Sequence, residues 1–283
     1  MQGNEKFLGR VASYAHKHAL WREGERILAA VSGGPDSLAL LLALKLLAVK
    51  EKINIGCCCV NHHLRAAAGK EAEFVESVCR EWNIPFILKE VDVQSAVRNG
   101  GSIETAARDF RYKALREAAR GGRYAKIAVA HHGDDQAETV LYHLLRGSGV
   151  TGLSGMKPIN GDIIRPFLCV SKNEIKDFLK DFSYVPCHDE SNDVEDAVRN
   201  RIRLSLVPEL ISYNPRVTES LRRTADIFRE EDLFMEEKAD VFISSCVEHD
   251  NDKCVFFIAY FLALHIALQR RVIRKICCMV AGR

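Results

Sequence analysis

Several common signatures are absent from this sequence of 283 residues. It has ten cysteines but no C-x-x-C pair, the spacing that zinc knuckles and redox dithiols usually show. No apolar run reaches the 18 residues that a membrane span needs, so we expect no membrane partner. No secretory signal precedes the first charged helix, so we expect a cytoplasmic protein with reduced thiols.

Neither sign of charge is in large excess, since 40 Lys and Arg oppose 38 Asp and Glu. The whole-chain charge therefore does not indicate a nucleic-acid partner. Locally the balance differs, because residues 199–229 contain seven arginines and three acids. Such a surplus is typical of a nucleic-acid contact, although a solvated helix face is the alternative interpretation.

Short apolar runs alternate with helical segments over the first 150 residues. Strands are predicted at 27–31, 53–60, 86–93 and 126–130, with helices between them at 38–50, 70–82 and 102–119. This alternation predicts an α/β fold, a mostly parallel, doubly wound sheet with helices on both faces, whose ligands bind at the carboxyl ends of the strands.

A helix is also predicted for the N-terminus, ending near Gly24, and another for 134–145. A short strand is expected at 163–168. Beyond Ser171 the sequence predicts almost only helix, including a buried helix over 255–268. We therefore expect two domains, 1–214 and a helical 215–283.

The loop after the first strand has the features of an anion-binding turn. Its residues are Ser32, Gly33, Gly34, Pro35, Asp36 and Ser37. The two glycines allow backbone N–H groups to approach a phosphate, and the following helix N-terminus adds a favourable dipole. Because a carboxylate repels phosphates, Asp36 indicates a bound Mg²⁺ ion. The loop matches neither the Walker A nor the dinucleotide fingerprint, and a simple capped turn is the alternative.

Two more polar segments follow strands or open helices. The segment 60–65 (VNHHLR) places His62 after the second strand, either at a nucleotide rim or in an ordinary surface loop. In 102–112, Arg108 and Arg111 share a helix face that suits a phosphate or a carboxylate. Pairing of Glu104 with Arg108 is the plainer explanation of that spacing.

The densest polar cluster follows the fourth strand. It contains His131, His132, Asp134, Asp135 and Glu138. A helix cap explains one acid but not the whole set. The H-x-x-x-H spacing of many zinc sites is missing, so we expect a carboxylate pocket for an amine, with Gly133 adding flexibility.

These motifs resemble a known family. The loop SGGPDS resembles the pyrophosphate loop of the N-type ATP pyrophosphatases, the PP-loop superfamily, whose fold is that of the adenine nucleotide alpha hydrolases. The pattern HHGDDQAETVLYHLLRGSGVTGLSGM at 131–156 closely resembles the tRNA(Ile)-lysidine synthetases. Further matches across residues 24–216 are VNHHLR, ETAARDFRY, Arg165-Pro166, DESN at 189–192 and RNRIR at 199–203.

The resemblance implies a ligase that joins L-lysine to C2 of the wobble cytidine of isoleucine tRNA with a CAU anticodon. ATP would first adenylate the C2 oxygen, releasing pyrophosphate, and the lysine ε-amine would then displace AMP. The resemblance implies ATP as a substrate, Mg²⁺ as a cofactor and a tRNA-contacting C-terminal domain, and it leaves a homodimer open.

Roles for individual residues follow from the same resemblance. The loop Ser32–Ser37 would hold the pyrophosphate, with Asp36 orienting Mg²⁺ and His62 at the nucleotide. Arg111 would neutralise either the α-phosphate or the lysine carboxylate. Asp135 and Glu138 would hold the lysine ammonium, with His132 moving a proton. Arg203 would contact AMP or a tRNA phosphate.

Two other functions compete with this interpretation. A tRNA thiolase of the same superfamily would share the loop, although many thiolases use C-x-x-C pairs. A nucleotide sensor without catalysis would also share the loop, but it has no need of the acids at 134–138.

Overall fold

The computed structural model describes all residues except 1, 62–67, 92–102, 183–196, 251–252 and 282–283. The chain divides into two compact units. Unit 1 is Met1–Tyr142 with Met156–Arg222, and unit 2 is His143–Gly155 with Arg223–Arg283. The two units divide after Arg222, and one short segment from the middle of the chain belongs with the C-terminal unit.

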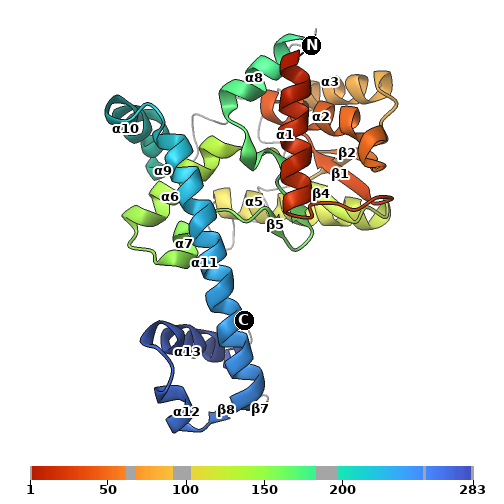
Figure 1. Ribbon diagram of the computed structural model, residues 1–283. Coiled ribbons are helices and arrows are strands. Elements are labelled where there is room, and N and C mark those ends of the chain that lie inside the picture. The colour runs from red at the N-terminus through yellow and green to blue at the C-terminus, as the bar shows by residue number, and fades with distance from the viewer. Residues whose placement is uncertain (1, 62–67, 92–102, 183–196, 251–252, 282–283) are drawn as a thin grey trace. The chain divides into compact units, whose positions relative to one another are not determined.

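Unit 1 is built on a six-stranded sheet in the order β3-β2-β1-β4-β6-β5. The strands are β1 (Arg26–Ala30), β2 (Asn54–Asn61), β3 (Phe86–Glu90), β4 (Lys126–Ala128), β5 (Ile159–Asn160) and β6 (Ile163–Ile164). Every pairing is parallel except that of β5 with β6. The predicted α/β fold with a mostly parallel sheet is therefore confirmed (Figure 1).

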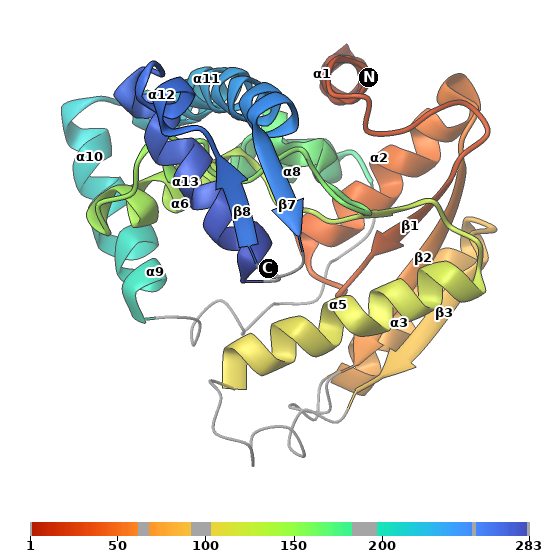
Figure 2. The same ribbon diagram turned by 90° about the horizontal axis from the view of Figure 1, so that it is seen from below.

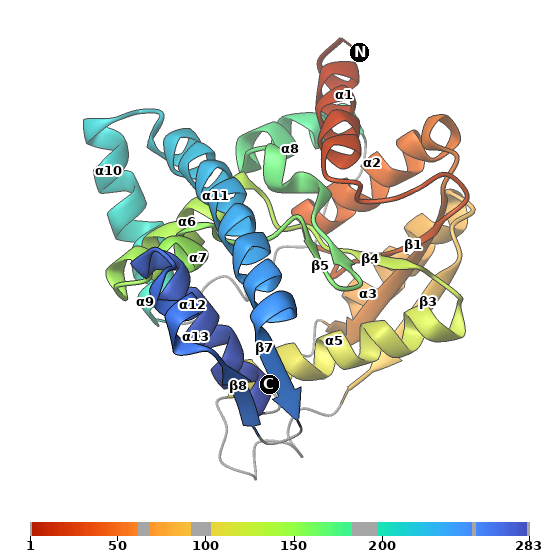
Figure 3. The same ribbon diagram turned by 60° about the horizontal axis from the view of Figure 1, so that its bottom comes forward.

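Helices cover both faces of this sheet. They are α1 (Gln2–Lys17), α2 (Pro35–Glu51), α3 (Ala68–Glu81), α5 (Ile103–Gly121), α6 (Gly133–Leu145) and α8 (Lys172–Lys180). Because side chains alternate along a strand, Ile27 and Ile164 pack with α2, whereas Leu28 and Ile163 pack with α5. Figures 2 and 3 show α5 along one face of the strands and α2 on the other.

Two predicted elements of unit 1 end four or more residues later in the prediction than in the structure. Helix α1 ends at Lys17 rather than near Gly24. The strand predicted at 163–168 stops at Ile164, and a 3-10 turn, η1 (Pro166–Cys169), follows. Pro166 has no N–H to donate to a neighbouring strand, which accounts for the early end of β6.

The last helices of unit 1 are short. They are α9 (Ala197–Arg201), a π-helical turn η3 (Ile202–Leu206) and α10 (Val207–Tyr213). Arg199 and Arg203 lie four residues apart, at a spacing that places two side chains on one helix face.

Unit 2 combines helices with a hairpin. Its elements are α7 (Val150–Leu153), most of α11 (Val217–Cys246), β7 (Val247–Asp250), β8 (Lys253–Phe256), α12 (Ile258–Leu262) and α13 (Ile266–Val280). A small core of Ala239, Phe242, Val272 and Ile276 joins α11 to α13. None of the helices in the described residues is long and apolar enough to cross a membrane.

The buried helix predicted over 255–268 is wrong. The run begins inside β8, where Val247 pairs with Phe256, and only α12 and the start of α13 are helical. Phe257 and Ile258 are 75% and 63% exposed. The β-branched and aromatic residues at 255–257 favour a strand, and a continuous apolar run does not by itself distinguish a strand from a helix.

Candidate active site

The loop Ser32–Ser37, here called the phosphate loop, joins β1 to α2. Gly33 has φ of +90°, a backbone conformation that side chains rarely adopt. The Ser37 hydroxyl accepts a hydrogen bond from the Ser32 N–H at 3.2 Å and donates one to the Gly34 carbonyl at 3.0 Å. The serines therefore hold the turn closed, so that the free N–H groups of the first turn of α2 can face an anion.

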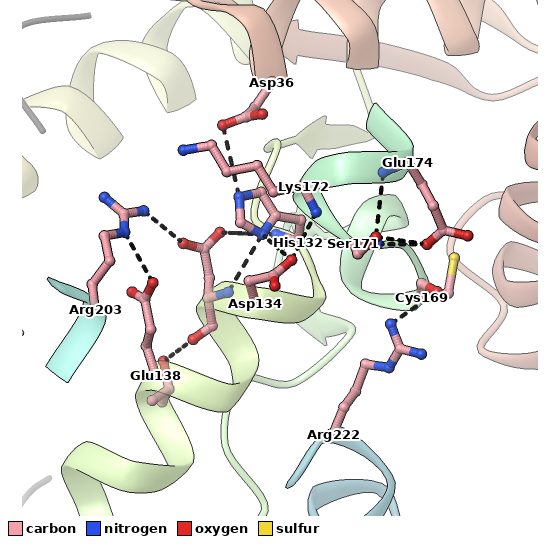
Figure 4. Close-up of polar contacts among 12 residues, drawn as sticks. Asp36, His132, Asp134, Glu138, Cys169, Ser171, Lys172, Glu174, Arg203 and Arg222 are labelled. Atoms are coloured by element: carbon pink, nitrogen blue, oxygen red, sulfur yellow. Dashed lines mark hydrogen bonds and ion pairs between the residues drawn. The ribbon is translucent and has the colours of Figure 1, made fainter. Parts of the chain in front are cut away.

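His132 links the phosphate loop to α6. Its side chain is only 2% exposed, and its Nε2 lies 3.7 Å from Asp36 Oδ2. Its Nδ1 lies 3.5 Å from Asp135 Oδ2 and 3.6 Å from Asp134 Oδ2 (Figure 4). Burial opposes a charge on the imidazole, but the three carboxylates, led by Asp135, outweigh burial and raise the pKa of His132.

The first two acids of α6 are fixed by backbone N–H groups. Asp135 Oδ2 accepts a hydrogen bond from the His132 N–H at 2.9 Å, and Asp134 Oδ2 accepts one from the Lys172 N–H at 2.7 Å. Burial alone would raise the pKa of Asp135, but the neighbouring histidines and this N–H lower it. Asp135 is therefore a carboxylate at neutral pH.

Gly133 begins α6 and is buried. A Cβ atom there would lie 2.9 Å from the Val170 carbonyl oxygen and 2.6 Å from an Arg222 nitrogen. Its own N–H donates to that carbonyl at 2.8 Å. Close packing therefore accounts for glycine at this position, and the expectation that Gly133 adds flexibility stays a prediction.

Glu138 lies one helical turn after Asp135, on the same face as predicted. It is buried, and it accepts hydrogen bonds from Arg203 Nε at 3.0 Å and Arg199 Nε at 3.4 Å. The same two guanidiniums lie 3.8 and 3.9 Å from Asp135 Oδ1. Figure 4 shows the Arg203 side chain beside Glu138. The two acids thus form a charge-balanced cluster with two arginines.

Arg199 was not among the predicted site residues. The i,i+4 spacing of Arg199 and Arg203 is the signal that could have found it, although spacing alone does not say which surface the shared face contacts. The roles predicted for Arg203, at AMP or a tRNA phosphate, and for the two acids, at an ammonium, stay predictions.

Arg111 lies on α5, where its guanidinium carbon is 5.5 Å from the centre of the Tyr112 ring. Its positive charge acts on His131. The structure thus places Arg111 beside the first histidine of the cluster, on the α5 face of the sheet. His62 and the DESN segment lie outside the described residues.

A divalent cation has a suitable ligand at the phosphate loop. Asp36 Oδ1 is buried and makes no hydrogen bond within the part of the chain that the structure describes. In that part no three His, Cys, Asp or Glu residues are grouped as a metal site. A single carboxylate together with substrate phosphates is the usual way proteins bind Mg²⁺, so Asp36 fits that ion.

The cysteines of β2 are core residues. Cys57, Cys58 and Cys59 are buried in the sheet, as the apolar run around them predicts. Burial is the main cause that raises the pKa of Cys58 and of Cys59 to about 12. These thiols are therefore unreactive at neutral pH.

The arginines of 199–229 divide into two groups. Four contact acids or carbonyls of the chain itself, namely Arg199, Arg203, Arg222 and Arg229. The other three, Arg201, Arg216 and Arg223, are exposed. The local charge surplus is therefore only in part available to an external partner.

Comparisons with known proteins give the family of the chain. Residues 5–210 match the PP-loop domain family. The tRNA(Ile)-lysidine synthase of Caldanaerobacter subterraneus is 36% identical over 276 residues, which is 96% of this chain and 59% of that protein. The tRNA(Ile)-lysidine synthase of Petrotoga mobilis is 36% identical over 233 residues, 80% of this chain and 74% of that protein.

The chain therefore spans about three fifths of the length of the Caldanaerobacter relative. Among solved structures, the U34-tRNA thiolase NcsA of Methanococcus maripaludis, with its [4Fe-4S] cluster, aligns with a TM-score of 0.65 over 80% of each chain. At 17% identity this likeness concerns the fold alone. On the sequence matches, the chain belongs to the PP-loop domain family and, within it, to the family of the tRNA(Ile)-lysidine synthases.

Proposed function

We propose that this chain catalyses the ATP-dependent ligation of L-lysine to C2 of the wobble cytidine of isoleucine tRNA with a CAU anticodon. The observation that carries the proposal is the direct link between the phosphate loop and the acids of α6. His132 Nε2 lies 3.7 Å from Asp36, and its Nδ1 lies 3.5 Å from Asp135. We place the reaction in the cytoplasm, with ATP, L-lysine and the tRNA as substrates.

In the first step the cytidine C2 oxygen attacks the α-phosphorus of ATP, and pyrophosphate leaves. The phosphate loop and the N-terminus of α2 hold the departing pyrophosphate. Asp36 would hold Mg²⁺, which neutralises phosphate charge when it is bound. In the second step the lysine ε-amine forms the bond to C2, AMP leaves with the oxygen, and the amine gives up a proton.

Asp135 and Glu138 are proposed to hold a lysine ammonium. Both acids are already neutralised by Arg199 and Arg203, so an entering ammonium takes the place of a guanidinium. The displaced arginine then becomes available for the phosphate of AMP or of the tRNA, the role expected of Arg203. His132, whose Nδ1 lies 3.5 Å from Asp135 Oδ2, accepts in its neutral form the proton of the attacking amine.

Pyrophosphate release by the purified chain tests the function. We expect release only when ATP, L-lysine and an isoleucine tRNA transcript with a CAU anticodon are all present, with labelled lysine recovered in the tRNA. Sulfur transfer to the tRNA would instead support a thiolase. Nucleotide binding without release under any combination would support a sensor and contradict the proposal.

Asp135→Asn tests the ammonium assignment. We expect the KM for lysine to rise far more than the KM for ATP, because the variant removes one carboxylate of the proposed ammonium site and leaves the residues of the phosphate loop in place. Asp162→Asn is the control, since this partly exposed acid pairs with Arg116 away from the cluster and should change neither constant. An equal rise in both constants for Asp135→Asn would reject the assignment.

A further inference from the structure

The phosphate loop carries no cationic side chain of its own. It contains no lysine or arginine, and its one charged residue is Asp36. A Walker A loop, by contrast, places a lysine among the phosphates. The N-terminus of α2 contributes only about half a positive charge, and Asp36 offsets part of the charge of the Mg²⁺ ion proposed there. A cationic side chain from another element would complete the site.

Helix α8 begins beside the first turn of α6. The Lys172 N–H donates to Asp134 Oδ2 at 2.7 Å, and the Gly133 N–H donates to the Val170 carbonyl at 2.8 Å. Asp134 Oδ2 in turn lies 3.6 Å from His132 Nδ1. Because residues 170 and 172 make these contacts through backbone groups, the contacts fix the place from which the side chain of Lys172 starts.

The Lys172 side chain points from α8 toward the phosphate loop. Figure 4 shows it running past His132 toward Asp36, whereas the Glu174 side chain points the other way. Glu174 is held there by an ion pair with Arg10, on α1. The two charged side chains in the first turn of α8 therefore separate, and the lysine is the one on the side of the phosphate loop.

The Lys172 ammonium makes no hydrogen bond or ion pair within the part of the chain that the structure describes. Its side chain is half-buried, and three carboxylates surround the neighbouring His132. Further along α8, Lys180 pairs with Asp177 at 2.7 Å, and Lys176 is exposed. A half-buried ammonium that no carboxylate engages is available to an anion.

We propose that Lys172 binds the pyrophosphate that leaves ATP, an inference that rests on the proposed function. Its ammonium supplies the compact charge and the rotatable donors that the loop lacks. As the bond between the α-phosphorus and the bridging oxygen breaks, negative charge develops on the pyrophosphate. Lys172 neutralises part of that charge and keeps its own proton. Two elements, α2 and α8, thus hold the same leaving group.

Lys172→Gln tests the assignment, because it removes the charge and keeps the backbone N–H that Asp134 accepts. Calorimetric titration with inorganic pyrophosphate measures affinity without tRNA or lysine. We expect the dissociation constant for pyrophosphate to rise about tenfold or more, and that for AMP to change less than about twofold. Unchanged pyrophosphate affinity in the folded variant would overturn the proposal. A loss confined to AMP would also overturn it, because Lys172 would then belong to the α-phosphate.

Two matched variants separate the charge of Lys172 from its packing. Lys176→Gln removes an exposed lysine one turn further along α8 and should leave the dissociation constant for pyrophosphate unchanged. Lys172→Arg keeps a cation that binds phosphates and should restore most of the affinity lost in Lys172→Gln. Equal losses in Lys172→Arg and Lys172→Gln would show a packing role and contradict the proposal.

Steady-state assays separate this inference from the proposed function. Lys172→Gln should lower kcat/KM for ATP and leave the KM for lysine unchanged. If the wild type ligates lysine but Lys172→Gln keeps its pyrophosphate affinity, only this inference fails. If the wild type binds pyrophosphate but ligates no lysine, the proposed function fails, and the comparison of the variants still decides this inference. A wild type without measurable affinity for pyrophosphate would overturn this inference too.

Discussion

At the scale of single residues, His132 connects the two halves of the candidate site. Its buried imidazole faces Asp36 from α2 and Asp134 and Asp135 from α6. Protonation of this one ring therefore reduces the repulsion among three carboxylates. The charge state of His132 and the arrangement of the acids depend on each other.

The pH dependence of stability should follow this coupling. The folded-state pKa of His132 is raised above 6.5. The contribution of the protonated imidazole to the free energy of unfolding is therefore fully present below about pH 6.5, and it is lost as pH rises through the folded-state pKa. We expect the free energy of unfolding to fall over that window in urea titrations, and the fall to be reduced in His132→Gln. A fall of the same size in the variant would show that other groups cause it.

Asp36→Ala should slow turnover on the order of 10²-fold or more, by comparison with the loss of other preorganised electrostatic groups. The same change should lower the pKa of His132, because one of its three carboxylates is removed. Steady-state pyrophosphate release and an NMR titration of the imidazole measure the two effects. Unchanged turnover would show that Asp36 serves only as an acid in the first turn of α2.

At the scale of elements, α6 is fixed at its start by close packing. Gly133 lies against Val170 and Arg222. One turn later the Gln136 side-chain oxygen accepts the Met156 N–H at 2.7 Å, and its amide nitrogen donates to the Met156 carbonyl at 3.2 Å. These contacts set the position of α6, from which Asp135 and Glu138 project.

Gly133→Ala should therefore destabilise the chain, by about 1–3 kcal/mol, and also reduce turnover by moving the acids. Gly9→Ala is the matched control, because Gly9 lies inside α1 and a Cβ there meets nothing within 4 Å. That control should be neutral or stabilising by about 0.5–1 kcal/mol. Thermal unfolding of the two variants measures both effects. Similar melting temperatures for Gly133→Ala and Gly9→Ala would contradict the packing argument.

At the scale of the whole molecule, the net charge of +2 conceals an uneven distribution. Arginines concentrate in 199–229, but the four that contact the chain itself are already engaged. The exposed members, Arg201, Arg216 and Arg223, are the ones left for a polyanion.

If these exposed arginines contact tRNA phosphates, affinity should fall with rising salt. Replacing one of them with Gln should weaken binding about equally for different tRNA sequences and reduce the salt slope by about one. Filter binding over a salt series measures this. The control Arg120→Gln, on α5, should keep the wild-type slope, and an unchanged slope in all three variants would exclude a phosphate role.

Local patterns in the sequence were sufficient for the α/β alternation, the phosphate loop and the clustering of Asp135 with Glu138. Each of these depends on residues close together in the chain, so periodicity, glycine placement and helix spacing are enough to predict it. The same patterns gave a wrong prediction for the apolar run at 255–268. A continuous apolar run is compatible with a strand or a helix, and the start of this run is a strand because β8 pairs with β7.

The tertiary structure alone decided which charges meet. It brought Arg199 and Arg203 against acids that lie more than sixty residues earlier in the chain. It also gave the adjacent His131 and His132 different charged neighbours, arginines for the first and Asp36 and Asp134 for the second. It also left Arg165 buried without a carboxylate among the described side chains. These relations follow from the order of strands in the sheet and from packing across it, and neither is determined by the spacing of residues along the sequence.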